Sequence, residues 1–227
     1  MSIEDPVITL LVFTDGRPHI WKTLPVFENR VTGPIKHRII INDEQDPAYD
    51  SKLHGIFGNG QSKYRVITWP QRMGFCRTIG RAWRILPKDT DYVFHFEDDF
   101  YIKENLDLMD FITVLRAHPK LAQMALLRQS WNPMEEECGG VIQKYPDWYV
   151  DHEYAGHKFN IHRVCFTTNP SLYPAWVAKR GYLPPPDCEG HFGMALVKDG
   201  YEFGYWGSKH DAPRVEHIGA GRRGTGY

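Results

Sequence analysis

The amino-acid sequence predicts an α/β fold in which helices flank a mostly parallel central sheet. Over the first hundred residues, short apolar runs typical of strands alternate with segments whose apolar residues recur at helical spacing. Polar residues follow three of these strand runs, at Thr14, Asp43 and Asp98. Ligands bind beyond the carboxyl ends of strands in such sheets, so these positions predict where a site lies.

The elements of the first half follow from apolar spacing and from residues that end regular structure. Strand runs are predicted over residues 7–13, 36–43, 63–70 and 89–100. A Gly and a Pro in "TDGRP" end the first strand, and Ile20, Leu24 and Phe27 then share one face of a predicted helix. A second helix is predicted over residues 72–86, since its apolar residues also share one face.

The second half of the sequence predicts less regular structure. An amphipathic helix is expected over residues 105–118, whereas residues 129–190, rich in Pro, Trp, Tyr and Gly, are expected to form long loops with binding surface. A helix, a glycine turn and a strand are expected over residues 189–207, before a glycine-rich tail. No repeat or linker divides the chain, so residues 1–227 are expected to form a single domain.

The composition fits a domain that folds alone and has no general attraction to polyanions. Of the 227 residues, 42% are hydrophobic and 14% aromatic, which is ample for a packed core. The 27 basic and 28 acidic residues give a formal net charge of −1, so a nucleic acid or an anionic membrane would have to be bound locally.

The cysteines and the N-terminal segment predict the cellular compartment. Cys76, Cys138, Cys165 and Cys188 lie far apart without a CxxC pair, which predicts reduced, mostly buried thiols rather than a zinc cluster or a disulfide framework. The N-terminal apolar run lacks a basic flank, and no segment approaches the ~20 apolar residues of a membrane span. A soluble cytoplasmic protein without stable membrane insertion is therefore expected.

The stretch "DYVFHFEDDFYI", residues 91–102, places three acids inside a run that otherwise predicts a buried strand. Adjacent carboxylates repel one another, and an unpaired charge in apolar surroundings is costly. A cation is therefore expected beside Glu97, Asp98 and Asp99. Oxygen-rich sites of this kind suit Mg²⁺ or Mn²⁺ shared with substrate phosphates. The alternative is a solvated turn after a strand, but the apolar flanks favour a cation site.

With these acids, the sequence resembles the nucleotide-sugar-dependent glycosyltransferases of the GT-A fold, especially inverting, family-two-like members, including small phage-encoded ones. The resemblance implies a nucleotide-sugar-binding half, residues 1–103, and an acceptor-binding half with a C-terminal lid, residues 104–227. In that family a Glu-Asp-Asp motif at a strand end holds the donor. By this resemblance Asp99 ligates the metal, Asp98 contacts the ribose, and Glu97 contacts the donor sugar or supports the metal site.

Three further blocks of the donor half carry the resemblance. "LLVFTDGRP" is similar to the family's opening strand and base-receiving loop, which implies that Thr14 and Arg17 bind the nucleotide. "IIIND" is similar to a strand ending in a nucleoside-binding Asp, here Asp43, and "MGFCRTIGRAW" to a Gly-led helix whose Arg77 or Arg81 meets the base or a phosphate. An ordinary turn and a solvated helix face are the alternatives.

A later block, "PPPDCEGHFGMALVKDGYEFGYW", resembles the family's motif that carries the catalytic base. Members place the base about eleven residues before a glycine, which selects Glu189 ahead of Gly200, with Asp187 as the competitor. A carboxylate near a helix start can accept the proton of an attacking hydroxyl.

The C-terminal residues also have counterparts in the family. The resemblance implies that His217 is a second metal ligand. Arg222 and Arg223 would lie in a mobile lid and neutralise the departing diphosphate.

The function implied is metal-dependent transfer of a sugar from a nucleoside diphosphate donor, with UDP-sugars favoured, to an acceptor hydroxyl. Inversion by single displacement is expected, although retention also fits a GT-A fold. The acceptor is left open among a hydroxymethylated DNA base, a protein and a glycan.

Three other classes of protein stay open. A glycoside hydrolase also needs two carboxylates, and a nucleotidyltransferase uses similar acids, although no Gly-rich phosphate loop followed by Lys is present. A non-catalytic carbohydrate- or nucleic-acid-binding module is suggested by five aromatic residues. They are Trp131, Trp148, Tyr149, Tyr154 and Trp176.

Overall fold

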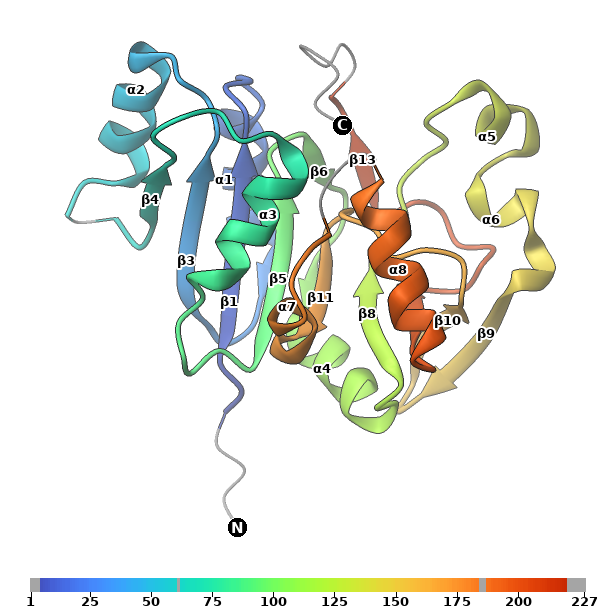
Figure 1. Cartoon of the computed structure of the whole chain (residues 1–227). Helices are drawn as coiled ribbons and strands as arrows, with labels where there is room; N and C mark the ends of the chain where they lie inside the picture. Colours follow the sequence, from blue (N-terminus) through green and yellow to red (C-terminus); the bar gives the residue numbers. More distant parts are fainter. Residues whose placement is uncertain (1–4, 61, 184–186, 220–227) are drawn as a thin grey trace.

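A computed structural model describes residues 5–60, 62–183 and 187–219, and is built around a nine-stranded sheet (Figure 1). The strands lie in the order β4-β3-β1-β5-β11-β8-β12-β10-β9. Their bounds are β1 Ile8–Thr14, β3 Ile35–Asn42, β4 Arg65–Thr68, β5 Tyr92–Glu97, β8 Leu121–Ala125, β9 Tyr149–Tyr154, β10 His157–His162, β11 Ser171–Pro174 and β12 Glu202–Trp206.

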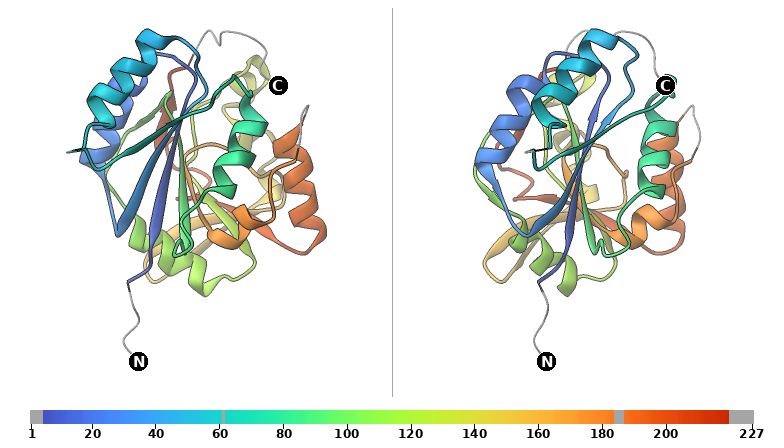
Figure 2. Two further views of the ribbon diagram at one scale, coloured as in Figure 1. Left: turned by 60° about the vertical axis from the view of Figure 1, so that its left-hand side comes forward. Right: turned by 90° about the vertical axis from the view of Figure 1, so that its left-hand side faces the viewer.

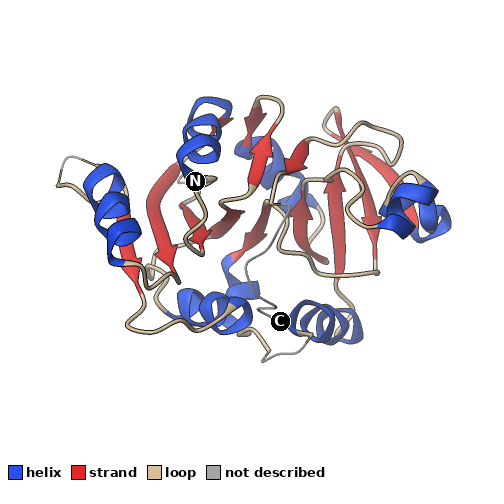
Figure 3. Ribbon diagram, turned by 90° about the horizontal axis from the view of Figure 1, so that it is seen from above, coloured by secondary structure: helices blue, strands red, loops and turns tan. Residues whose placement is uncertain are grey.

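Helices cover both faces of this sheet, as the view from above shows (Figure 3). Their bounds are α1 Ile20–Arg30, α2 Pro47–Phe57, α3 Phe75–Arg84, α4 Leu108–Ala117, α5 Pro133–Cys138, α6 Val141–Lys144, the 3₁₀ turn η1 Pro146–Trp148, α7 Ala175–Lys179 and α8 Cys188–Lys198. Two small sheets pair β2, Val31–Thr32, with β7, Leu106–Asp107, and β6, Phe100–Ile102, with β13, Val215–His217.

The predicted α/β fold with a mostly parallel sheet is confirmed. β4, β3, β1 and β5 are parallel neighbours, and β8 pairs in parallel with β12. In the described part of the chain, only β11 and β10 run against the other strands of this sheet. One sheet contains strands from both predicted halves of the chain, residues 1–103 and 104–227, since β5 pairs with β11.

The two larger hydrophobic clusters of the described residues lie on opposite faces of the sheet. Alternate residues of β1 point to opposite faces, so Leu10 and Val12 pack with α1 and α4, whereas Leu11 and Phe13 pack with α3, α7 and α8. All seven residues of β1 are buried, which is typical of a parallel strand covered by helices on both sides.

Helix boundaries follow from side chains that satisfy free backbone N–H groups. The predicted helix over residues 105–118 begins at Leu108, because Leu106 and Asp107 pair with β2 and the Asp107 carboxylate caps the helix at Met109 N. α3 begins after Gly74, whose φ of 77° lies in the left-handed region that glycine adopts most easily.

The expectation of long loops over residues 129–190 is wrong. This segment contains α5, α6, the hairpin of β9 and β10, the inner strand β11 and α7. The hairpin extends the sheet at its edge, and β11 lies between β5 and β8. Aromatic residues that suggested loop surface therefore partly belong to strands, and Tyr149 is 1% exposed.

The expectation of reduced cysteines is also wrong for two of the four. Cys76 and Cys188 form a disulfide between α3 and α8, which lie side by side on one face of the sheet (Figure 2). Cys138 and Cys165 are free thiols. Because disulfides persist mainly in oxidising compartments, this bond does not fit the expected cytoplasmic location.

Across the residues that the structure describes, every helix is too short or too polar to cross a membrane.

Candidate active site

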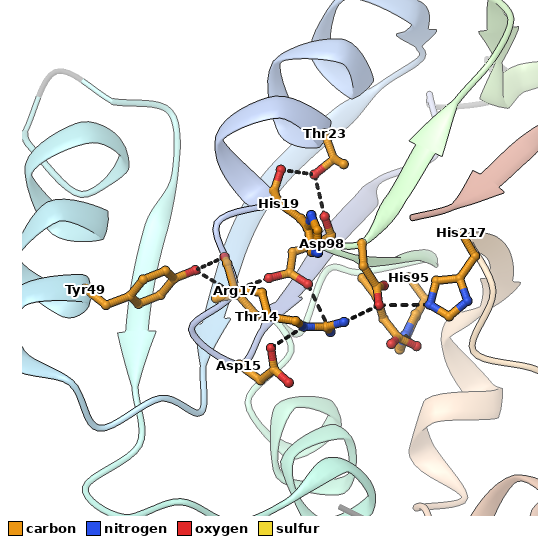
Figure 4. A network of polar contacts seen from close by, with 11 residues as sticks. Thr14, Asp15, Arg17, His19, Thr23, Tyr49, His95, Asp98 and His217 are labelled. Atoms are coloured by element: carbon orange, nitrogen blue, oxygen red, sulfur yellow. Dashed lines mark hydrogen bonds and ion pairs between the residues drawn. The ribbon is translucent and has the colours of Figure 1, made fainter. Parts of the chain in front are cut away.

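Polar residues gather where β1, β3 and β5 end. The chain leaves β3 with Asp43 N donating to Thr14 O at 3.0 Å, and leaves β5 with Asp98 N donating to Phe13 O at 2.9 Å. These backbone bonds hold Thr14, Asp43 and Asp98 at one edge of the sheet. Thr14 and Asp98 lie beside Arg17 there (Figure 4). This is the edge at which open α/β sheets bind ligands.

Asp98 is a fully buried carboxyl group with several donors. Its Oδ2 accepts from Thr14 Oγ1 at 2.6 Å, its Oδ1 lies 3.3 Å from Arg17 Nη2, and its backbone oxygen accepts from Thr23 Oγ1 at 2.7 Å. Tyr49 extends this network, since its hydroxyl lies 2.5 Å from Thr14 Oγ1. Burial raises the pKa of Asp98 well above its usual value, despite the opposing charge of Arg17.

Asp99 is equally buried but responds in the opposite direction. Its Oδ2 accepts from Arg17 Nη1 at 2.5 Å and lies 2.9 Å from His217 Nε2. Burial alone would raise the pKa of Asp99, but the hydrogen bond from His217 and the charge of Arg17 lower this pKa to about 2. A proton therefore settles on Asp98 before Asp99, which relieves the repulsion between the two neighbours.

Arg17 contacts three carboxylates. Besides Asp98 and Asp99, it donates from Nε to Asp15 Oδ1 at 2.6 Å. Burial lowers the pKa of Arg17, but these acids outweigh it and raise the pKa above the ordinary value. The guanidinium of Arg17 thus faces the acids from the loop after β1. That this loop receives the nucleotide base, and that Arg17 contacts it, stays a prediction.

The residues around Asp99 fit a divalent cation in a limited way. Asp99 Oδ1 is buried and accepts no hydrogen bond from any described residue, so one carboxylate oxygen has no partner while His217 Nε2 lies beside the other. A carboxylate and an imidazole suit Mn²⁺, and such ions complete their shells with water and substrate phosphates. The described residues include no group of three His, Cys, Asp or Glu side chains arranged to hold a metal, so most ligands would come from elsewhere.

Glu97 lies at the end of β5 and is 7% exposed. Its Oε1 lies 3.6 Å from Nε2 of His95, whose ring stacks on Phe13 with centroids 4.6 Å apart. Sequence reasoning missed His95, although its position two residues before Glu97 on one strand already predicts that both side chains share a face.

Asp43 and Arg77 lie in different surroundings. The Asp43 carboxylate accepts from Met73 N and Gly74 N, both at 2.8 Å, so it orders the turn into α3. Arg77 is exposed on α3, and Arg81 lies over the Trp69 ring at 4.4 Å from its centroid. Neither arginine joins the cluster around Asp99 in an interaction among the described residues.

The two predicted bases stand at the start of α8 but in different roles. Asp187 is exposed, and its Oδ1 accepts from Gly190 N at 3.0 Å, which makes it the N-cap. Glu189 is half-buried, and its Oε1 accepts from Thr168 N at 2.6 Å. Arg222 and Arg223 lie outside the described residues.

Sequence reasoning missed residues that bind the cluster from other elements of the chain. Thr23 and Tyr49 reach it from α1 and α2, and Gln129 binds the main chain of His217 through both atoms of its amide. Nothing in their local sequence predicts these contacts, because each depends on how distant elements pack.

No known protein-family profile matches the sequence, and no curated protein matches it. Solved structures match the fold. GalNAc-T7 with UDP, GalNAc and Mn²⁺ aligns with a TM-score of 0.69 at 8% identity, covering 96% of this chain and 44% of that chain. The mannosyltransferase PcManGT from Pyrobaculum calidifontis, in complex with GDP-Man and Mn²⁺, gives 0.64 at 12%, covering 97% and 59%.

TarS 1–349 from S. aureus gives a TM-score of 0.60 at 12% identity, covering 93% of this chain and 60% of that chain. The chain therefore spans about half the length of the structures that it resembles. These neighbours are glycosyltransferases of the GT-A type, and the likeness shows that this chain has the GT-A fold.

Proposed function

We propose that the protein is a glycosyltransferase that uses a divalent cation to bind a nucleoside diphosphate sugar. The observation that carries this proposal is the position of Asp99 just after β5 in a GT-A fold: one of its carboxylate oxygens has no partner among the described residues, and His217 lies beside the other. In a purely structural turn, a buried carboxylate oxygen would ordinarily accept a hydrogen bond. One neighbour was solved with UDP and another with GDP-Man, and we favour UDP-sugars as donors because the structure with UDP gives the higher TM-score.

Asp99 and His217 would hold the cation, which when bound supplies positive charge for the leaving diphosphate. Asp98 would contact the ribose, supported by Thr14, and Glu97 would contact the donor sugar. Asp43, at the end of the neighbouring strand, would contact the nucleoside. Arg17 already lies against the acids and offers a permanent positive charge next to the diphosphate. Arg77 and the tail residues Arg222 and Arg223 complete the set of proposed phosphate contacts.

Glu189 would remove the proton of the acceptor hydroxyl, in a single displacement that inverts the anomeric centre. We prefer it to Asp187 because Glu189 stands eleven residues before Gly200, at the spacing of the base in the family that the sequence resembles, whereas the exposed Asp187 carboxylate is the N-cap of α8. The acceptor is a hydroxymethylated DNA base, a protein or a glycan.

Calorimetric titration with UDP, GDP, dTDP and CDP, each with Mn²⁺ and with EDTA, tests the donor site. The expected result is Mn²⁺-dependent binding of one nucleotide that Asp99→Asn abolishes. Asp89→Asn is the matched control, because Asp89 is exposed and pairs with Lys36 and His37 outside the cluster. Binding that ignores both Mn²⁺ and Asp99 would show that the cluster is structural.

A further inference from the structure

His217 is packed between two aromatic rings. Phe100 stacks on it with centroids 4.6 Å apart and planes 10° apart, and the Trp131 centroid lies 3.7 Å away at 35°. Two rings this close to one imidazole cannot share a face, so they lie on opposite faces. Rotation of the imidazole out of its plane is therefore blocked from both sides.

The packing replaces a hydrogen bond that metal-binding histidines ordinarily have. In such a histidine the second ring nitrogen usually donates a hydrogen bond to a carboxylate or carbonyl group, which fixes the orientation of the ring. In His217, Nδ1 is buried and has no hydrogen-bond partner among the described residues, while Nε2 lies 2.9 Å from Asp99 Oδ2. The orientation of the imidazole thus depends on the two neighbouring rings.

The backbone of His217 is held by the segment that carries Trp131. Gln129 Nε2 donates to His217 O at 2.9 Å, and His217 N donates to Gln129 Oε1 at 2.9 Å. Leu127 O accepts from Arg214 N at 3.0 Å, so the two segments also pair along their main chains. Trp131 and His217 are consequently fixed relative to each other through backbone as well as ring contacts.

Glu135 fixes Trp131 in turn. This carboxylate, 7% exposed, accepts from Arg128 Nη1 at 2.6 Å, from Arg128 Nη2 at 3.1 Å, from Trp131 N at 2.8 Å and from Asn132 Nδ2 at 3.0 Å. The bonds close residues 128–135 into one loop, because they join both ends to its middle. Trp131 is thus held by the part-buried ion pair of Arg128 and Glu135, and is itself half-buried.

We infer that Trp131 is a positioning residue for His217: with Gln129 and Glu135 holding its segment, the indole keeps Nε2 of the imidazole aimed at Asp99. The inference rests on the proposed function only for the cation that His217 would bind. Trp131 does not itself offer a ligand atom, since its indole nitrogen is a donor only. Trp131 instead contributes by fixing the orientation of His217, which does offer a ligand atom.

The test compares Trp131→Ala, Trp131→Phe and the control Trp148→Ala in the full chain. Trp148 is the matched control, because it is 55% exposed and stacks on Tyr145 rather than on His217. Mn²⁺ affinity is measured by electron paramagnetic resonance with and without UDP. We expect Trp131→Ala to weaken Mn²⁺ binding roughly 10-fold, Trp131→Phe to restore most of it, and Trp148→Ala to leave it unchanged.

A second measurement separates this inference from the proposed function. In the metal-free protein, imidazole ¹⁵N spectra report whether His217 keeps one ring orientation, with no donor or cation needed. We expect exchange broadening of the His217 signals in Trp131→Ala and a sharp spectrum in Trp131→Phe. If wild type binds no Mn²⁺ but the spectra behave in this way, the proposed function fails and the inference stands.

Gln129→Leu provides an independent variant in case Trp131→Ala does not fold. It removes both amide bonds to the His217 backbone and leaves the ring contacts in place, so the same broadening is expected. An unchanged His217 spectrum in the folded variants, with Mn²⁺ affinity equal to wild type, would overturn the inference.

Discussion

Cys76 and Cys188 are joined by a disulfide that fastens the first turn of α3 to the first turn of α8. Both cysteines are buried, at 3% and 1% exposure. The bond adjoins Glu189, so it fixes the start of the helix that carries the proposed base. It also closes a long loop, because the two residues are 112 positions apart in the chain.

Removing this disulfide should lower the free energy of unfolding by about 2–5 kcal/mol, because a cross-link over so long a loop restricts the unfolded chain strongly. Chemical denaturation of the double variant Cys76→Ser, Cys188→Ser measures the effect. Cys138→Ser is the control, since Cys138 is an exposed free thiol. Equal stability of the double variant and wild type would mean that the bond does not form.

The strands of the first half could be predicted because each is an apolar run with a polar residue at its end, as in Leu11 to Thr14. The acid cluster could be predicted for the same reason, since Asp98 and Asp99 interrupt an apolar context. The approach of His217 to Asp99, 118 residues earlier in the chain, depended on a family resemblance, because local patterns do not report pairing of distant strands.

The hairpin of β9 and β10 was missed for physical reasons. Five of the six residues of β9 are exposed, so the strand lacks the alternation that identifies a half-buried strand. Its turn uses Ala155 and Gly156 at φ of 52° and 81°, a conformation usually signalled by Asn-Gly or Asp-Gly. The disulfide was missed because widely spaced cysteines carry no information on which helices will pack together.

His162 should make the protein less stable in mild acid. Burial lowers the pKa of this histidine to about 3, whereas an unfolded histidine titrates near 6.5. The unfolded chain therefore binds a proton that the folded protein excludes. The contribution is complete above about pH 6.5 and is lost as the pH falls toward 3, at up to ~1.4 kcal/mol per pH unit.

Denaturation of wild type and His162→Phe between pH 7.5 and pH 4.5 checks this dependence. The variant keeps a ring against Tyr149 and Tyr205 but cannot take up a proton. Its stability should fall less steeply with acid, and parallel curves for the two proteins would contradict the assignment. Other titrating groups contribute equally to both curves.

Arg17→Met should destabilise the cation-free protein by about 3 kcal/mol, because it leaves Asp98 and Asp99 buried without their guanidinium. Mn²⁺ should stabilise this variant, since it binds the folded state only. Thermal denaturation in EDTA and in Mn²⁺ measures both effects.

The control for Arg17→Met is Arg163→Met, which breaks an exposed pair with Glu202 and should cost less than ~1 kcal/mol. If EDTA and Mn²⁺ give the same melting temperature for Arg17→Met, the buried acids Asp98 and Asp99 do not form a cation site.

Gly219 should be required for donor binding, because the chain passes directly over the acids at this residue. Ile218 N donates to Asp99 O at 2.8 Å, and a Cβ on Gly219 would lie 2.1 Å from Asp99 Oδ2 and 2.7 Å from Arg17 Nη1. Gly219→Ala must therefore displace either the carboxylate or the segment that carries His217. We expect nucleotide affinity in Mn²⁺ to fall roughly 10-fold, which calorimetry measures.

Gly55→Ala is the matched control for Gly219→Ala. Gly55 lies within α2, and a Cβ there meets no atom within 4 Å, so alanine should stabilise the helix by about 0.5–1 kcal/mol and leave nucleotide affinity unchanged. Wild-type affinity in Gly219→Ala would mean that this segment moves away from Asp99 when the donor binds, and that His217 does not hold the cation from its present position. If nucleotide affinity falls in Gly219→Ala but not in Gly55→Ala, the close approach of the chain at residue 219 is needed for donor binding.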